Sequence, residues 1–285
     1  MKIVILSFNH PQLTEKTLRS ALQHVLPSQI LLVHNGSLEV HQKKLRQLFP
    51  EVEHLVLFAN RGFSGGANAG LRRAFAKTGT DWVLFLTNDC QLLELSSPPS
   101  QVSLTAPLIW ARKVGNVDSV GGILEIKSAH LRHCKSEEEF ADALGKNYVP
   151  GTAFWLHREV FQAVGGFDES LGTYWEDVDF SFCARRAGFP LAADIRTKVL
   201  HAVGKTCHKD AHYTTYLFQR NRQRVSLRCA RQSGISALQV RASLIRSWGK
   251  LAYGHWKAKR WDRLRLLSSA IVDRQKLREK GTAYL

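Results

Sequence analysis

Short apolar runs alternate with longer amphipathic stretches over residues 1–90 of the chain. Four of these runs are short enough to be buried strands: Ile3–Ser7, Gln29–His34, Val52–Phe58 and Trp82–Leu86. The stretches between them predict three helices: Pro11–Leu22, Leu38–Phe49 and Gly65–Ala76. Strands separated by helices of this length predict an α/β protein with a doubly wound, mostly parallel sheet.

Polar residues follow the predicted strands at the points where they end. Ser7-Phe8-Asn9 closes the first strand, His34-Asn35-Gly36-Ser37 closes the second, and Asn88-Asp89 closes the fourth. In an open parallel sheet, ligands bind outside the carboxyl ends of the strands. The sequence therefore predicts a ligand site at this edge.

The middle and the end of the chain have different patterns. Ser96–Ser100 contains two prolines and predicts a loop, and Gly115–Glu125 indicates either a hairpin or a mobile segment. From about Ala211 the chain is helical and basic to its end. We find no internal repeat and no low-complexity tract.

Asp89 follows the continuously apolar interior of the fourth strand. A carboxylate at this position is suited to holding a hard divalent cation through oxygen. The alternative is an Asp that only forms a turn and caps the next element. His201 also follows an apparent strand, but a lone His is more often structural than functional.

The run from Trp175 to Phe180 places three carboxylates within four positions: Glu176, Asp177 and Asp179. Acids at a helix N-terminus are common because they suit the helix dipole and the free N–H groups. That explanation accounts for one acid better than for three. Crowded like charges raise the pKa of at least one carboxyl, which suits a general base.

Asn60–Gly70 is a glycine-rich turn that enters a helix, which suggests a phosphate cradle at a helix N-terminus. The run matches neither the nucleoside triphosphatase loop nor the dinucleotide fingerprint after a first strand. Both of those function classes are therefore poorly supported.

The net charge of +16 is concentrated at the C-terminus. Residues 231–285 hold 13 Lys and Arg against 3 Asp and Glu. We therefore expect this basic tail, and not the rest of the chain, to bind a partner. The charge is not interleaved with a nucleic-acid-reading motif, and we expect no nucleic-acid partner.

Two further features bear on cellular location. The five cysteines form no CxxC pair and predict reduced, mostly buried thiols rather than a zinc site or a disulfide framework: Cys90, Cys134, Cys183, Cys207 and Cys229. The apolar run Ile3–Leu6 is too short for a signal peptide, and no stretch approaches the roughly 18 apolar residues of a membrane span. We expect a cytoplasmic protein, either free or peripheral at the inner face of the cell membrane.

Taken in order, these motifs resemble the family 2 glycosyltransferases of the GT-A fold, especially the rhamnosyltransferase-like branch. The resemblance covers about residues 1–225 and rests on five runs: Ile5–Asn9, Val33–Ser37, Asn60–Gly70, Leu86–Asp89 and Val149–Gly188. The last run is the most specific, with Gly165-Gly166-Phe167-Asp168-Glu169 followed by the crowded acids. The resemblance implies a GT-A catalytic domain at 1–225, with a nucleotide-sugar half at about 1–90 and an acceptor half at about 91–225. A basic helical extension would occupy 226–285.

The resemblance also implies roles for individual residues. Asp177 would be the base that deprotonates the acceptor hydroxyl. Asp89 and His201, with Gly204 behind it, would hold Mg²⁺ or Mn²⁺. Asn68 would lie near the donor or be only structural. The implied donor contacts are Ser7, Asn9, Asn35, Arg61, Gly65, Asn68, Asn88 and Arg220, and the implied acceptor contacts are Gly151, Trp175 and Glu176.

Two positions depart from the family pattern. His34 stands where an acid usually precedes Asn-Gly-Ser, which puts the carboxylate contact to a pyrimidine base in question. Thr87-Asn88-Asp89 leaves one carboxylate at the DXD position instead of two, so a weak metal site is expected.

These features predict an inverting, metal-dependent transfer of a sugar from a dTDP-, UDP- or GDP-linked donor to the hydroxyl of a glycan or lipid-linked acceptor. Surface polysaccharide or glycolipid assembly is the implied setting. The alternative is a catalytically silent GT-A-like protein that binds a nucleotide or a glycan.

The tail contains two apolar helical stripes. The first is Val240, Leu244, Trp248 and Leu251, and the second is Trp261, Leu264, Leu267 and Ile271. Basic residues surround both stripes, and this pattern suits an anionic membrane surface. The alternatives are packing on the catalytic domain or on a second copy in a homodimer.

Overall fold

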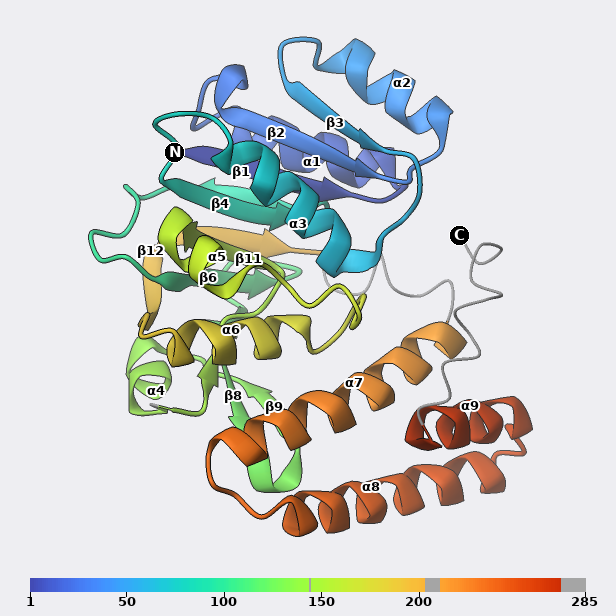
Figure 1. Ribbon diagram of the computed structural model, residues 1–285. Coiled ribbons are helices and arrows are strands. Elements are labelled where there is room, and N and C mark those ends of the chain that lie inside the picture. The colour runs from blue at the N-terminus through green and yellow to red at the C-terminus, as the bar shows by residue number, and fades with distance from the viewer. Residues whose placement is uncertain (144, 203–210, 273–285) are drawn as a thin grey trace.

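The computed structural model describes residues 1–143, 145–202 and 211–272, and Figure 1 shows their arrangement. The strands are β1 Lys2–Ser7, β2 Ile30–Asn35, β3 Glu53–Leu57, β4 Trp82–Thr87, β5 Cys90–Glu94, β6 Leu104–Ala111, β7 Val117–Ser119, β8 Gly122–Glu125, β9 His130–His133, β10 Asn147–Tyr148, β11 Ala153–His157 and β12 Leu191–His201. The α-helices are α1 Pro11–Ala21, α2 Glu39–Leu48, α3 Gly62–Phe75, α4 Glu137–Asp142, α5 Arg158–Val164, α6 Glu176–Arg186, α7 Ala211–Gln232, α8 Ala237–Lys257 and α9 Trp261–Val272.

The main sheet has the strand order β3-β2-β1-β4-β11-β6-β12-β5, and β7 pairs with β6. The pairs β3–β2, β2–β1 and β1–β4 are all parallel. The strands and helices predicted over residues 1–90 are confirmed, with ends that differ by at most three residues. The predicted α/β class is therefore confirmed, and the parallel arrangement holds throughout this half of the sheet.

The other half of the sheet is mixed. β11 runs antiparallel to both of its neighbours, β4 and β6, and β12 is parallel to β6 but antiparallel to β5. A parallel pair needs a long crossover, whereas an antiparallel strand can enter from the edge at which its neighbour ends. The first residues of β11 therefore lie beside the last residues of β4, at the predicted ligand edge.

The segment Gly115–Glu125 forms two short strands that do not pair with each other. β7 pairs with β6 of the main sheet, whereas β8 pairs with β9 and β10 in a separate three-stranded sheet. The expectation of one hairpin or a mobile segment was wrong. Gly121, at φ +102°, lies between the two strands and allows the chain to pass from one sheet to the other.

Helices cover both faces of the main sheet (Figure 1). Successive residues of β1 alternate between these faces: Ile3 packs in a cluster with Leu18 of α1, and Val4 packs in a cluster with Leu71 of α3. All of the residues of β1 are buried, as a strand covered on both sides requires.

The C-terminal helices confirm the predicted helical tail over the described residues. α7 packs against α6, α8 and α9, and in Figure 1 it lies between α6 and α8. The domain boundary expected at residue 225 falls inside α7. No helix among the described residues is long and apolar enough to cross a membrane. Four of the five cysteines lie in the described residues as free thiols, and Cys207 lies outside them.

Candidate active site

The polar residues predicted at the ends of β1 and β4 form one hydrogen-bonded group. The Ser7 and Thr14 hydroxyls are 2.8 Å apart, and Asn88 Nδ2 donates to Thr14 Oγ1 at 3.2 Å. Asn9 has a left-handed backbone, and its side-chain oxygen accepts from the Leu38 amide at 3.1 Å. Four residues of this region were expected to contact the donor, and we call them together the donor edge: Ser7, Asn9, Asn35 and Asn88.

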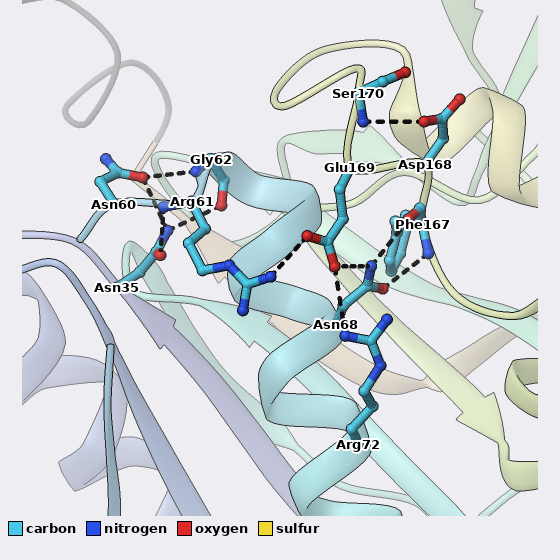
Figure 2. A network of polar contacts seen from close by, with 10 residues as sticks. All are labelled: Asn35, Asn60, Arg61, Gly62, Asn68, Arg72, Phe167, Asp168, Glu169 and Ser170. Atoms are coloured by element: carbon cyan, nitrogen blue, oxygen red, sulfur yellow. Dashed lines mark hydrogen bonds and ion pairs between the residues drawn. The ribbon is translucent and has the colours of Figure 1, made fainter. Parts of the chain in front are cut away.

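Asn35 at the end of β2 shapes the turn before α3 (Figure 2). Its Nδ2 donates to Asn60 Oδ1 at 3.1 Å and to the Gly62 carbonyl at 2.9 Å, and its Oδ1 accepts from the Arg61 amide at 3.0 Å. A Cβ added at Gly36 would lie 2.2 Å from the Asn60 backbone nitrogen. Only glycine therefore allows this close approach of the two turns.

The glycines of α3 pack the helix onto the sheet. A Cβ at Gly66 would lie 2.7 Å from Leu6, and a Cβ at Gly70 would lie 2.7 Å from Val33. These distances are shorter than contacts between non-bonded carbon atoms. The two glycines therefore allow α3 to pack closely on β1 and β2. A Cβ added at Gly65 would lie 2.6 Å from the Cβ of Arg61.

Asn68 connects α3 to the chain that follows Gly166 (Figure 2). Its Nδ2 donates to the Phe167 carbonyl at 2.9 Å and to Glu169 Oε1 at 3.0 Å, and its Oδ1 accepts from the Phe167 amide at 2.8 Å. Asn68 is buried, and protein groups occupy both ends of its amide. Arg61 pairs with Glu169 at 2.8 Å. Of the two roles expected for Asn68, these contacts support the structural one.

Asp89 and His201 lie together because of the strand register. His201 at the end of β12 is paired with Cys90 at the start of β5, and Asp89 immediately precedes Cys90. His201 Nε2 is 3.4 Å from Asp89 Oδ2, and Thr87 Oγ1 donates to Asp89 Oδ1 at 2.7 Å. The two metal ligands implied by the resemblance are therefore neighbours. Gly204 lies outside the described residues.

Two residues that the sequence reasoning missed adjoin this pair. Asp118 Oδ2, on β7, is 3.8 Å from His201 Nδ1, and Asp118 Oδ1 is 3.4 Å from His133 Nδ1 on β9. His201 Nδ1 is buried and has no hydrogen-bond partner among the described residues. Asp118 gave no signal in the sequence because it lies in Gly115–Glu125, where the sequence indicates only a hairpin or a mobile segment. We call Asp89, Asp118, His133 and His201 the charged cluster.

The charged cluster holds strongly perturbed groups. Burial lowers the pKa of His201, but the carboxylates of Asp118 and Asp89 outweigh it and raise the pKa to about 9. His133 and then His201 hold the pKa of Asp118 well below its usual range. Without a cation, His201 therefore carries a proton between two carboxylates at neutral pH.

Asp177 lies in the first turn of α6, after two residues with positive φ, Tyr174 and Trp175. Its Oδ2 accepts from the Gly151 amide at 3.0 Å, and its Oδ1 accepts from its neighbour's amide, Val178, at 2.8 Å. Burial raises the pKa of Asp177, and these amides oppose the rise. A carboxylate with a raised pKa is suited to accepting a proton near neutral pH.

Residues 151 and 152 connect Asp177 to Asp89. Gly151 donates to Asp177, and the Thr152 carbonyl accepts from the backbone amide of Thr87 at 3.0 Å. Thr87 in turn donates its hydroxyl to Asp89. The antiparallel entry of β11 creates this connection, and it places the proposed base and the proposed metal ligand on one hydrogen-bonded path.

Trp175 and Glu176, expected to line the acceptor pocket, are both buried. Trp175 Nε1 and Glu176 Oε2 have no hydrogen-bond partner among the described residues. Burial and then the charge of Asp177 raise the pKa of Glu176 well above its usual range. Burial and the neighbouring Asp177 charge therefore both disfavour the ionised form of Glu176.

α7 holds the loop that precedes Trp175. Asn221 Nδ2 donates to the carbonyls of Leu171, Thr173 and Tyr174 at 2.7–2.9 Å. Arg220 was expected to contact the donor, and in the structure its guanidinium donates to the Leu171 carbonyl at 2.9 Å. In the structure, both side chains therefore support the acceptor half.

His34 faces away from the donor edge. Its ring is buried and stacks on His54 of β3, with Nε2 of His34 2.9 Å from Nδ1 of His54. Burial, together with the charges of His54 and Arg46, lowers the pKa of His34 to about 4. The residue that replaces the family's usual acid is therefore neutral and packed between strands.

The comparison with protein families gives one match that covers more than half of the chain. A family described as Glycosyl transferase family 2 matches residues 2–165. The chain is 26% identical over 264 residues to N-acetylglucosaminyl-diphospho-decaprenol L-rhamnosyltransferase of Mycobacterium tuberculosis, which covers 78% of this chain and 86% of that protein. It is 23% identical over 236 residues to a low-salt glycan biosynthesis hexosyltransferase of Haloferax volcanii, covering 78% and 74%.

Two solved structures share the fold. GalNAc-T7, in a structure with UDP, GalNAc and Mn²⁺, has a TM-score of 0.56 at 16% identity, and the match covers 76% of this chain but only 47% of that one. The mannosyltransferase PcManGT from Pyrobaculum calidifontis, with GDP-Man and Mn²⁺, has a TM-score of 0.52 at 15% identity, covering 100% and 76%. These similarities confirm the predicted GT-A fold.

Proposed function

The chain is a glycosyltransferase that belongs to glycosyl transferase family 2, of the rhamnosyltransferase-like type, and from this premise we propose the reaction it performs. We propose that it transfers a sugar from a nucleotide-diphosphate sugar to an acceptor hydroxyl, with inversion at the anomeric carbon and with a divalent cation. The observation that carries the proposal is the path from Asp177 through residues 151 and 152 to Asp89.

Asp89 and His201 are the residues that would hold Mg²⁺ or Mn²⁺. The oxygen and imidazole donors suit these ions, and their side chains are already 3.4 Å apart. Among the described residues, no group of three or more His, Cys, Asp and Glu is arranged to hold a metal ion. Two protein ligands would leave coordination positions on the cation that diphosphate oxygens and water would fill.

Asp118 has a supporting role in this proposal. A carboxylate that faces one nitrogen of a histidine keeps the proton there and leaves the other nitrogen for a metal. Asp118 faces Nδ1 of His201, while Nε2 faces Asp89. Asp118 would therefore position His201 without being a ligand itself.

Asp177 carries the proton transfer. Its carboxylate takes the proton of the acceptor hydroxyl as the acceptor oxygen bonds to the anomeric carbon, and the bond from that carbon to the diphosphate breaks. A bound cation would stabilise the negative charge of the departing diphosphate. One base and one leaving group on opposite sides of the sugar describe a single displacement, which inverts the anomeric configuration.

The relatives suggest the classes of donor and acceptor. The mycobacterial relative is named for an acceptor on a diphospho-decaprenol, and solved structures of the fold hold UDP or GDP-Man. We propose a lipid-linked or glycan acceptor in surface polysaccharide or glycolipid assembly, with a dTDP-, UDP- or GDP-linked donor.

Asp177→Asn tests the proposal. Transfer should fall by about 10² or more because the general base is lost, while binding of the nucleotide sugar with Mn²⁺ is unchanged because Asp177 acts on the acceptor. Transfer would be measured with the donor found in a screen of nucleotide sugars, and donor binding by calorimetry. Asp142→Asn, an exposed carboxylate at the end of α4, is the matched control.

If Asp177→Asn retains transfer within about tenfold of wild type, the assignment of the base is wrong. If the wild type binds a nucleotide sugar but neither transfers nor hydrolyses it, the alternative of a silent binding protein is correct.

A further inference from the structure

The outer surface of α8 carries an apolar face that was not predicted. Its members are Leu238, Ile245, Tyr253 and Trp256, which are 57–74% exposed. They lie 7, 15 and 18 residues beyond Leu238, which corresponds to about two, four and five helical turns. The four side chains therefore share one side of the helix, and the Tyr253 and Trp256 rings are 6.0 Å apart.

This outer face is opposite the stripe predicted from the sequence. Val240, Leu244 and Trp248 of that stripe are buried in a cluster with Val225 and Cys229 of α7. Packing on the rest of the chain, one of the alternatives considered for the tail, therefore accounts for that stripe except at its last residue, Leu251, which is partly exposed. Among the described residues, this packing leaves the side chains of the outer face of α8 mostly exposed.

The turn after α8 extends the face with one more aromatic residue. Trp261, the first residue of α9, is 56% exposed and belongs to the second apolar stripe predicted from the sequence. In Figure 1, α8 and this turn lie at the edge of the molecule farthest from β3, with α7 between α8 and α6. The face is therefore open to a large, flat partner.

Cations surround the outer face. Exposed Lys and Arg side chains lie along α8 and in the turn that follows: Arg241, Arg246, Lys250, Lys257, Lys259 and Arg260. Asp262 is the one acidic residue in the described part of 237–272. An apolar stripe with Trp and Tyr, flanked by Lys and Arg, has the composition of a helix that lies in the headgroup region of a bilayer.

We propose that the outer face of α8, together with Trp261, docks the protein on an anionic lipid bilayer. Charge decides between this partner and a second copy of the chain. In a two-fold dimer the same patch would face itself, so its cations would repel one another. Anionic headgroups attract each of these cations, with about 1 kcal/mol for each Lys or Arg near the surface.

The test is sedimentation of the full-length protein with vesicles. Vesicles of phosphatidylcholine with about one third phosphatidylglycerol should bind the protein at low salt, and phosphatidylcholine alone should bind it much less. Raising the salt should release the protein because the attraction of headgroups for cations is screened.

Paired substitutions locate the surface. Leu238→Ser with Ile245→Ser should lower the partition coefficient roughly tenfold or more because two side chains no longer enter the apolar region. The matched control is Leu26→Ser with Val40→Ser, since these residues are 66–68% exposed and lie in the N-terminal segment that precedes β3. Trp256→Ser with Trp261→Ser should also reduce binding.

Three results would overturn the proposal. The first is full-length protein that ignores anionic vesicles at low salt, and the second is an equal loss of binding in the control pair. The third is sedimentation analysis in which the wild type is a dimer that Leu238→Ser with Ile245→Ser dissociates. The vesicles contain no acceptor, and Asp177→Asn should bind them like the wild type, so failure here is separate from failure of the proposed reaction.

Discussion

The donor edge and the Asp89–His201 pair of the charged cluster lie at the same side of the main sheet, but the two regions are built in different ways. The donor edge consists of neutral side chains that already hydrogen-bond to the protein, such as Asn35 to the turn at Asn60 and Ser7 to Thr14. The charged cluster contains ionised groups with perturbed pKa values, and His201 Nδ1 has no hydrogen-bond partner among the described residues.

The difference indicates that the donor edge determines the shape of the site and that the charged cluster takes part in its chemistry. A neutral, fully bonded edge fixes the backbone around a ligand, and its residues act mainly through the turns they hold. A cluster of close charges is costly to maintain unless a ligand uses it, so such groups are candidates for chemistry. Substitutions in the charged cluster should therefore change activity more than stability, and substitutions on the other half of the sheet should do the reverse.

The largest effect is expected at the two proposed ligands. Asp89→Asn and His201→Ala should each weaken the Mn²⁺-dependent binding of nucleoside diphosphate by about 100-fold or more, since loss of a group that only supports a ligand costs about 10- to 100-fold. Because both would hold one ion, the double variant should be little worse than either single variant. Calorimetric titration with and without Mn²⁺ measures these affinities.

Asp81→Asn is the control for that experiment. Asp81 is an exposed carboxylate that immediately precedes the first residue of β4, at the end of the strand away from Asp89. Additive losses in the double variant would mean that the two residues serve different ligands. Unchanged affinity in both single variants would show that Asp89 and His201 are not metal ligands.

A smaller effect is expected at Asp118. Asp118→Asn should lower Mn²⁺-dependent affinity by about 10- to 100-fold because His201 loses the carboxylate that fixes its proton on Nδ1. The loss should be accompanied by a changed pH profile of Mn²⁺ binding, which a purely structural role would not produce. Calorimetric titration of diphosphate at several pH values measures both, with Asp142→Asn as the control. An unchanged profile with intact affinity would show that Asp118 does not position His201.

The smallest effect on activity is expected at His34, in the parallel half. The folded-state pKa of His34 is lowered from 6.5 to about 4, so its contribution to stability is present above pH 6.5 and is lost as the pH falls toward 4. The free energy of unfolding should drop by on the order of 2 kcal/mol between neutral pH and about pH 5. His34→Gln should flatten this slope in urea titrations and leave donor affinity unchanged.

His130→Gln, which removes an exposed histidine on β9, should keep the wild-type slope. If His34→Gln weakens donor binding instead, His34 takes part in binding and the contrast between the two regions fails.

Local pattern was enough to predict the parallel half of the sheet. Each strand over residues 1–90 is a single apolar run, and each is separated from the next by one helix, so pairing follows chain order closely. The polar residues at the ends of β1, β2 and β4 could be placed at one edge for the same reason. Asn35 and Asn88 do lie there, although their side chains bond to the protein.

The mixed half could not be predicted in this way. Asp118 and His201 are 83 positions apart and meet because β7 and β12 both pair with β6. No local pattern encodes such a contact. The contacts of Arg220 could not be predicted for a related reason, since its position depends on how α7 packs across the loop at Leu171.

α7 has a consequence for how this protein can be divided or recombined. At its middle Asn221 fixes the loop before Trp175, and about one and two turns later Val225 and Cys229 form the surface on which α8 packs. A chimera that exchanges the C-terminal helices with those of a relative should not be cut within α7, because either half would lose part of its own support. Gly234, with φ +66° between α7 and α8, is the junction that leaves the loop intact. The same restriction applies to substitutions within α7, because this helix must remain compatible with the loop and with α8 at once.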